Sequence, residues 1–313
     1  MAEEAVKTDA AEPRKLSKRA LKQERMKDLS TGERRYLLRL ALQKRIWKVF
    51  RFVILFGLGF VIMYPIIYMI SCAFREKADM SDPTVMWIPR HYTFDVITET
   101  LDAMDYWETL GTTLLLNIGC SLFQVISCAV TGYGFARFKF RGRDFLFAML
   151  VFTMMVPAQV TMITTFIIID DIGLYDSVWA LIIPSFVNVF GIYLCKQFCE
   201  EIPRELIESA RIDGAGDFAI YWRIVIPQIR PAIGALAIFT FMEYWNDYLN
   251  PLIYLSSTEK MTLPLALSYF STQHSTDLSA TMAASALIMI PAAIVFIIFQ
   301  KQFIKGLSMT GMK

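Results

Sequence analysis

Long apolar segments alternate with short polar connections along most of this chain. Six segments are each near the ~20 residues that cross the hydrocarbon core of a bilayer as a helix; they are residues 52–74, 110–135, 145–169, 177–195, 232–255 and 280–300. The pattern predicts an all-α membrane protein in which six transmembrane helices occupy residues 52–304. Polar residues 1–51 precede this domain, and residues 305–313 are expected to form a tail.

Residues 1–51 contain no apolar region of the kind found in signal peptides, so nothing in them indicates cleavage. Roughly the first 28 residues have the composition of a disordered segment. Ser30, with Glu33 three residues later, then matches a capping box, and the apolar residues that follow share a helical face among arginines and lysines. We expect an amphipathic helix on the inner leaflet that leads into the first span. A nucleic-acid-binding tail is the alternative, but one basic cluster beside a membrane segment favours contact with lipid.

The distribution of Lys and Arg predicts the orientation of the spans. Of the 31 such residues, 15 lie in residues 1–51, 4 in 136–144, 5 in 196–230 and 3 after residue 300, whereas 4 lie in the alternate connections. Cytoplasmic connections of membrane proteins carry the excess of basic residues. Both termini and the connection 196–230 are therefore expected in the cytoplasm.

The composition limits the possible functions. With 55% hydrophobic and 19% charged residues, the chain of 313 residues is too apolar for a soluble enzyme. It contains no Gly-x4-Gly-Lys-Ser/Thr phosphate loop, so we expect no catalytic residues and no ATP hydrolysis in this chain. The five Cys and two His do not have the spacing of a metal site, and we expect neither a metal nor another cofactor here.

A polar and charged island at residues 205–231 separates the fourth and fifth apolar segments. Pro203 opens a stretch with acidic residues in its first turns and one apolar face, which predicts a short helix that ends at Ile212. Two glycines, Gly214 and Gly216, follow it. A second short helix, 218–226, is expected to end at Pro227, so that the island forms a compact, protruding pair of helices.

The island resembles a known signature. Glu208-Ser209-Ala210, then Gly214, then residues 224–227 (Ile-Val-Ile-Pro) are similar to the loop Glu-Ala-Ala-x3-Gly-x9-Ile-x-Leu-Pro of ABC-importer membrane subunits. Ser209 and Ile226 depart from that signature but keep the size class of the residues they replace. The strings 210–215 and 244–252 and the dipeptide at 306–307 are similar to the carbohydrate branch, which includes the smaller permease subunit of maltose transporters.

This resemblance implies a type I ABC importer permease fold with both termini in the cytoplasm. In that family the loop is a coupling helix that docks into a groove on a cytoplasmic ATPase. The residues that the resemblance assigns to this contact are Glu205, Glu208, Ser209, Ala210, Arg211, Asp213, Gly214 and Pro227.

The resemblance also implies a complex in the bacterial inner (cytoplasmic) membrane. The expected partners of this multi-pass chain are a second, homologous permease subunit, two ATP-binding subunits that hold ATP and Mg, an extracytoplasmic sugar-binding protein and the lipid bilayer, with no nucleic acid. The outer connections 75–108 and 256–279 would seat the binding protein. An aromatic belt at the membrane interface is the alternative for the first of them.

Polar residues inside the spans predict a substrate pathway, because such residues are costly in a bilayer. The fifth span has four of them on one helical face beside an aromatic ring, and the second span has a weaker stripe. Carboxylates, amides and aromatic faces bind sugars through hydrogen bonds to hydroxyls and through stacking. The pathway residues predicted in this way are Asn117, Gln124, Glu243, Tyr244, Asn246, Asp247 and Asn250. Contact between helices at a subunit interface is the alternative, and Gln159 and Asn188 are interpreted as packing contacts.

Together these features predict the membrane-spanning half of an ATP-driven, binding-protein-dependent importer of mono- or oligosaccharides. Two carboxylates suit a phosphate ester poorly, so a neutral sugar is favoured, with glycerol phosphate, polyols or peptides as alternatives. An ion-coupled secondary transporter is another hypothesis, in which Glu243 and Asp247 relay a proton or cation. A membrane scaffold without transport is a third.

Overall fold

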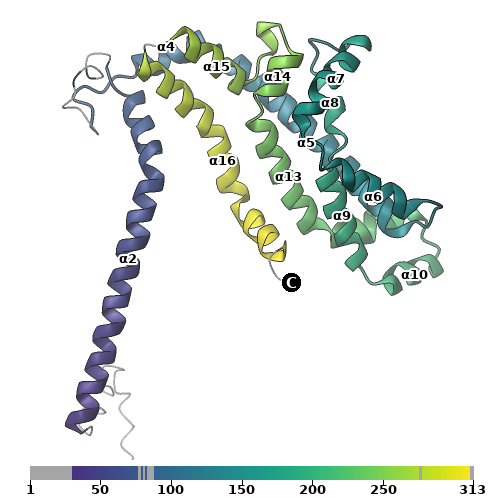
Figure 1. Ribbon diagram of the computed structural model, residues 1–313, viewed down its shortest axis with the longest axis horizontal. Helices are drawn as coiled ribbons and strands as arrows, with labels where there is room; N and C mark the ends of the chain where they lie inside the picture. The colour runs from purple at the N-terminus through teal and green to yellow at the C-terminus, as the bar shows by residue number, and fades with distance from the viewer. Residues whose placement is uncertain (1–29, 77–78, 80–81, 83–87, 275–276, 311–313) are drawn as a thin grey trace, which may run out of the picture. The chain divides into compact units, whose positions relative to one another are not determined.

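The computed structural model describes residues 30–76, 79, 82, 88–274 and 277–310 (Figure 1). Over these residues the chain is helical between short connections, and one isolated antiparallel bridge pairs Arg75 with Tyr92. The segment expected to be disordered lies outside the described residues. The chain divides into two compact units, one that ends at Ile66 and one that begins at Ile67.

The longest helix, α2 (Thr31–Ala73), runs for 43 residues without interruption. Its start confirms the capping box: the Ser30 N–H donates to Glu33 Oε2 at 3.0 Å, and the Glu33 N–H donates to Ser30 Oγ at 3.4 Å. The expected amphipathic helix and the first span are therefore one helix. No Gly or Pro occurs in residues 33–56, so the sequence offers no break between them.

The other elements follow in chain order (Figure 1). They are α4 (Asp95–Ala103), α5 (Tyr106–Arg137), α6 (Arg143–Thr153), α7 (Ala158–Asp171), α8 (Trp179–Ser185), α9 (Val189–Glu201), α10 (Arg204–Ile212), α11 (Asp217–Ile220), η1 (Tyr221–Val225), α12 (Ile226–Gln228), α13 (Arg230–Trp245), α14 (Leu249–Tyr254), η2 (Thr258–Lys260), α15 (Leu263–Gln273) and α16 (Leu278–Thr310). In the described part of the chain, 4 stretches are long and apolar enough to cross a membrane alone, and up to 6 if each of two bent helix pairs is one span.

Three of the predicted spans are broken helices. Segment 145–169 consists of α6 and α7, whose axes are bent by 102°. Segment 177–195 is interrupted between α8 and α9, and segment 232–255 between α13 and α14. The four polar residues of the fifth span therefore do not lie on one continuous helical face.

Local hydrogen bonding accounts for these breaks. Pro157 precedes α7 and lacks the N–H of a helical hydrogen bond. The Asn188 side chain accepts the Gly191 N–H at 2.8 Å and so caps the start of α9. The Asp247 carboxylate accepts the Asn250 N–H at 3.2 Å at the start of α14. Each polar cap satisfies a backbone donor that a continuous helix would have paired.

One predicted helix end is also wrong. The second island helix passes Pro227 and ends at Gln228, after a π-helical turn at η1. Because Pro227 has no N–H and its ring crowds the carbonyl four residues earlier, the wider π turn accommodates it. The expected tail is helical through Thr310, since α16 continues to that residue.

Helix α5 is the centre of the second unit and packs against α9, α13 and α8. A Cβ atom at Gly132 would lie 2.7 Å from Cys195 Cβ, and one at Gly191 would lie 2.7 Å from Cys128 Sγ. Glycine at these positions permits the close approach of α5 and α9. The two helices are thus held together along the length that connects the island with the interior of the bundle.

Candidate coupling surface and translocation cavity

The island is anchored to the bundle by one side of α10. Ile207, the one buried residue of α10, is 6% exposed and belongs to a core cluster that includes Tyr133 of α5 and Tyr221 of η1. Most residues assigned by resemblance are exposed: Glu205, Glu208, Ser209, Arg211, Asp213, Gly214 and Pro227. Ala210 is partly buried and packs against this core. We call residues 203–228 the coupling surface.

Gly214 fixes the turn between α10 and α11. Its φ of +84° is in the left-handed region. The Ala215 N–H donates to the Ala210 carbonyl at 2.9 Å, and the Gly214 N–H donates to the Arg211 carbonyl at 3.0 Å. This pair of bonds is a Schellman motif, which requires a residue at Gly214 that tolerates positive φ. Arg211 Nη2 and Asp217 Oδ1, 2.9 Å apart, form an ion pair across the same turn.

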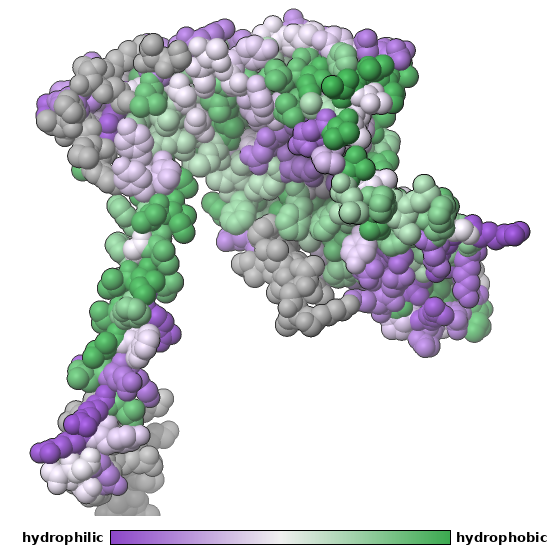
Figure 2. All heavy atoms as spheres, in the orientation of Figure 1, coloured by the Kyte–Doolittle hydropathy of each residue, from purple (hydrophilic) through white to green (hydrophobic). Residues whose placement is uncertain are grey.

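Apolar side chains stand exposed on the coupling surface. Ile212 is 86% and Phe218 77% exposed, and the rings of Phe218 and Trp222 pack edge to face, with their centroids 6.2 Å apart. Figure 2 shows a mainly hydrophilic surface over α10 next to hydrophobic surface over α6. Large apolar groups exposed within a polar surface are typical of a protein contact.

Arg137, the last residue of α5, is hydrogen-bonded to the end of α9. Its Nη2 donates to the carbonyl oxygens of Cys199 and Ile202, directly before α10 begins. The last carbonyls of a helix have no partner within the helix, so the guanidinium satisfies two that would otherwise be unpaired. Arg137 therefore ties α5 to the segment directly before the coupling surface, and the contact between Tyr133 and the core around Ile207 ties α5 to the coupling surface itself.

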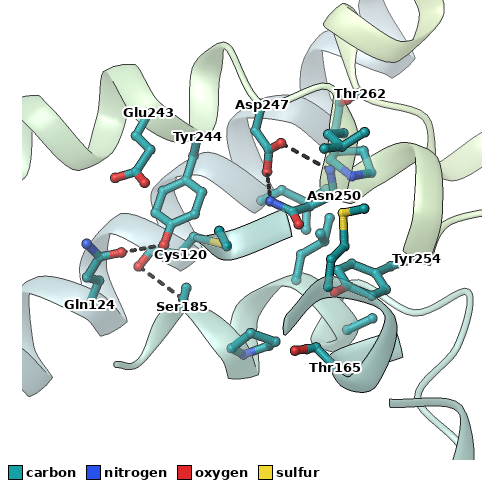
Figure 3. A pocket seen from close by; sticks show the side chains of 18 of the residues that line it. Cys120, Gln124, Thr165, Ser185, Glu243, Tyr244, Asp247, Asn250, Tyr254 and Thr262 are labelled. Atoms are coloured by element: carbon teal, nitrogen blue, oxygen red, sulfur yellow. Dashed lines mark hydrogen bonds between the residues drawn. The ribbon is translucent and has the colours of Figure 1, made fainter. Parts of the chain in front are cut away.

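A cavity of about 540 Å³ lies in the second unit, with walls from α5, α7, α8, α13 and α14 (Figure 3). Six of the seven predicted pathway residues line it: Asn117, Gln124, Glu243, Tyr244, Asp247 and Asn250. Because the helix breaks between α13 and α14, residues of both helices line this cavity. The volume is in the range of small-molecule binding sites, about 300–1,000 Å³.

The predicted pathway residues differ in their contacts. The Tyr244 hydroxyl donates to Gln124 Oε1, and Asn250 Nδ2 donates to Asp247 Oδ2 at 2.8 Å. Asn117 Nδ2 donates to the Phe241 carbonyl at 3.0 Å, which joins α5 to α13. Asn246 does not line the cavity: the helix ends there, and its amide donates to the Met242 carbonyl at 2.7 Å.

Sequence reasoning missed several cavity residues. Gln159 and Asn188, interpreted as packing contacts, both line the cavity, although Asn188 also caps α9. The other polar lining residues that were not predicted are Thr113, Thr161, Thr165, Ser185 and Thr262. Single Ser and Thr residues in apolar segments carry no periodic signal, and Thr262 precedes α15 in a connection. Their position depends on the folded arrangement alone.

Asp176, between α7 and α8, joins that connection to the one after α14. Its carboxylate accepts the N–H groups of Ser256 at 2.9 Å and Ser257 at 3.0 Å, the Ser257 hydroxyl, and Lys260 Nζ at 2.9 Å. The hydrogen bonds from Ser257, with those from Ser256 and Lys260, hold the pKa of the Asp176 carboxyl well below its ordinary value. The charged carboxylate therefore fastens the two connections.

Asp176→Asn is expected to lower the unfolding temperature of the purified protein by about 2–4 °C near neutral pH. Because the folded-state pKa is lowered, the stabilisation is present above the unfolded-state value of about 3.9 and is lost as the pH falls below it. Unfolding followed by fluorescence in detergent from about pH 3 to about pH 8 measures the difference from wild type, which should shrink at the acid end. The control is Asp170→Asn, at an exposed carboxylate of α7. A difference that is absent near neutral pH would refute the role of Asp176.

Known proteins share this arrangement. The family described as "Binding-protein-dependent transport system inner membrane component" matches residues 128–309, which contain the coupling surface and the α13 and α14 side of the cavity. The chain belongs to this family. This permease is a multi-pass membrane subunit of an ABC importer, and such subunits are not enzymes, since the ATPase is a partner. The recognition of the family from the island is confirmed.

Relatives of the permease cover most of its length. It is 33% identical to the Arabinooligosaccharides transport system permease protein AraQ of Bacillus subtilis (strain 168), over 72% of this chain and 80% of that protein. It is 29% identical to the Maltodextrin transport system permease protein MdxG of the same organism, over 85% and 96%. A crystal structure of a bacterial ABC transporter involved in the import of the acidic polysaccharide alginate matches with a TM-score of 0.75 and 26% identity, over 83% of this chain and 98% of that one. These likenesses confirm the predicted permease fold.

Proposed function

We propose that this permease forms half of the translocation pathway of an ATP-driven saccharide importer. The observation that carries the proposal is its 33% identity, over 72% of the chain, to a permease named for arabinooligosaccharides. The names of the maltodextrin permease and of the alginate importer support the same substrate class. A second, homologous permease would supply the other half of the pathway, and a binding protein outside the membrane would deliver the saccharide.

The coupling surface is the proposed docking site of the ATPase, which would bind ATP and Mg. Its exposed Ile212, Phe218 and Trp222 are suited to enter a groove on a partner, and its acidic side chains would form the polar rim of the contact. The ATPase side is the cytoplasm, so this assignment agrees with the orientation that the basic residues predict. Both termini would then be cytoplasmic.

Helix α5 would carry movement from the ATPase to the cavity. One end of α5 contacts the coupling surface through Tyr133, and Arg137 binds the carbonyl groups directly before that surface. Asn117 and Gln124 of the same helix line the cavity. A packed helix of this kind moves as a rigid body when one end is displaced. Closure of the ATPases would thereby open the cavity alternately to the two sides of the membrane.

Uptake of radiolabelled arabinotriose and maltotriose by cells that express the complex tests the proposed function. We expect ATP depletion to lower uptake about tenfold or more, and a protonophore that leaves ATP intact to change it by less than about twofold. A strain without the permease gives the background. The opposite pattern would favour ion-coupled transport through Glu243 and Asp247, and no saccharide uptake at all would refute the substrate class.

A further inference from the structure

Two residues that line the cavity each have one buried side-chain atom without a hydrogen-bond partner among the described residues. Gln124 is fully buried, and although its Oε1 accepts the Tyr244 hydroxyl, its Nε2 is unpaired. Thr262 is 5% exposed, and its Oγ1 is unpaired. Buried amide and hydroxyl groups are nearly always hydrogen-bonded. A cavity lined by two unpaired groups therefore indicates a ligand that can both donate and accept hydrogen bonds.

Carboxylates supply further acceptors in the same cavity. Figure 3 shows Glu243 next to Gln124 and Tyr244, with Asp247 and Asn250 further along. Asp247 is already engaged by Asn250, whereas Glu243 forms no hydrogen bond or ion pair with any described residue. A saccharide hydroxyl donates one hydrogen bond and accepts others, so adjacent hydroxyls can donate to Glu243 and accept from Gln124 Nε2 at once. Tyr244 also lines the cavity and supplies an aromatic ring there, whereas the ring of Tyr254 is buried and stacked on Phe166.

The charged side chains that line the cavity are all acidic. Among the residues that line it, Glu243 and Asp247 are acidic and none is Lys, Arg or His. Glu243 is exposed and Asp247 half-buried, and like charges closer together than the Debye length repel each other. The carboxylate of a uronic acid would therefore meet two acidic side chains and no cation, whereas the hydroxymethyl group of a neutral sugar would meet hydrogen-bond acceptors.

We infer that this subunit itself contains a saccharide-binding site, formed by Gln124, Thr262, Glu243 and Tyr244, that accepts uncharged saccharides and rejects uronates. The inference rests on the proposed function and narrows it. It separates the permease from the similar alginate importer, whose cargo is described as an acidic polysaccharide, and groups it with the permease named for maltodextrin.

Binding to the purified complex without its binding protein tests the inference. The probes are neutral and acidic trisaccharides in matched pairs, galactotriose with trigalacturonate and maltotriose with triglucuronate, together with arabinotriose. Equilibrium dialysis should give an affinity for at least one neutral trisaccharide that exceeds that for its uronate about tenfold or more. Gln124→Leu should weaken neutral binding about tenfold, while Glu243→Gln with Asp247→Asn should reduce the discrimination to about threefold or less.

The outcomes separate the inference from the proposed function. Asp170→Asn removes an exposed carboxylate of α7 that does not line the cavity, and it should leave binding and discrimination unchanged. Equal binding of neutral and acidic trisaccharides, or discrimination that survives removal of both carboxylates, would overturn the inference while saccharide uptake still supports the proposed function. Uptake of a saccharide without any binding to the complex would refute a site in this subunit. Absence of both uptake and binding would refute the proposed function as well.

Discussion

Gly214→Ala is expected to lower saccharide uptake about tenfold, whereas Gly216→Ala should lower it less than about twofold. The two glycines stand two residues apart on the coupling surface, and a Cβ atom would meet nothing within 4 Å at either position. They differ in backbone conformation: φ is +84° at Gly214 and −71° at Gly216. Positive φ costs an L-residue about 1–2 kcal/mol, so only the first substitution disfavours the turn after α10.

Uptake rates normalised to the amount of permease in the membrane measure this difference. Gly214→Asn is a useful third variant, because Asn tolerates positive φ better than Ala and should retain more activity. Equal activity of the two alanine variants would show that the Schellman turn does not matter for coupling. A loss of the protein from the membrane in Gly214→Ala alone would point to folding as its role.

Arg137→Met is expected to reduce uptake about tenfold or more while ATP hydrolysis by the complex persists. The substitution leaves two carbonyls at the end of α9 without the guanidinium, and hydrogen bonds to charged groups contribute about 1.5–3 kcal/mol each. The segment that connects α9 with α10 would then move independently of α5. Arg137→Lys, which keeps the charge but not the two-pronged geometry, should be intermediate.

Proteoliposomes that contain the whole complex allow ATP hydrolysis and uptake to be compared directly. Arg143→Met, at the first residue of α6, removes a guanidinium whose one ion pair among the described residues is with its exposed neighbour Asp144. It should leave the ratio of uptake to hydrolysis unchanged. A parallel fall of both activities in Arg137→Met would mean that the residue supports assembly of the complex and does not transmit movement. A ratio of uptake to ATP hydrolysis that is the same in Arg137→Met as in the wild type would refute the coupling role of Arg137.

The sequence predicted where the helices lie better than it predicted their shape. Apolar length and composition indicated segments that contain helices in the structure, because burial in a bilayer requires about 20 apolar residues whatever their local geometry. The bends depend on single residues such as Pro157, Asn188 and Asp247, whose effect is decided by whether a side chain or a neighbour satisfies the freed backbone groups. Hydropathy contains no information about that choice. The orientation of the termini stays a prediction.

The helix and turn at the start of the coupling surface could be predicted because their signature is local, while the contact with an ATPase stays a prediction. Pro203, Gly214 and the helical spacing between them fix a short helix and a left-handed turn within a dozen residues or so. The cavity is different, since Gln124 and Thr262 come to line the same space only after α5 and the connection before α15 pack together. The unpaired amide of Gln124 is likewise a property of the folded structure.

Purification of the intact complex tests whether the coupling surface docks an ATPase that drives the permease. The tagged permease would be extracted gently from its native membrane as wild type and as Ile212→Asp with Phe218→Asp, and its partners identified by mass spectrometry. We expect an ATP-binding subunit and a second, homologous permease with the wild type. The variant should lose the ATP-binding subunit and keep the second permease, because both altered side chains are exposed. Recovery of the wild type alone or with copies of itself, or full retention of the ATP-binding subunit by the variant, would contradict the account.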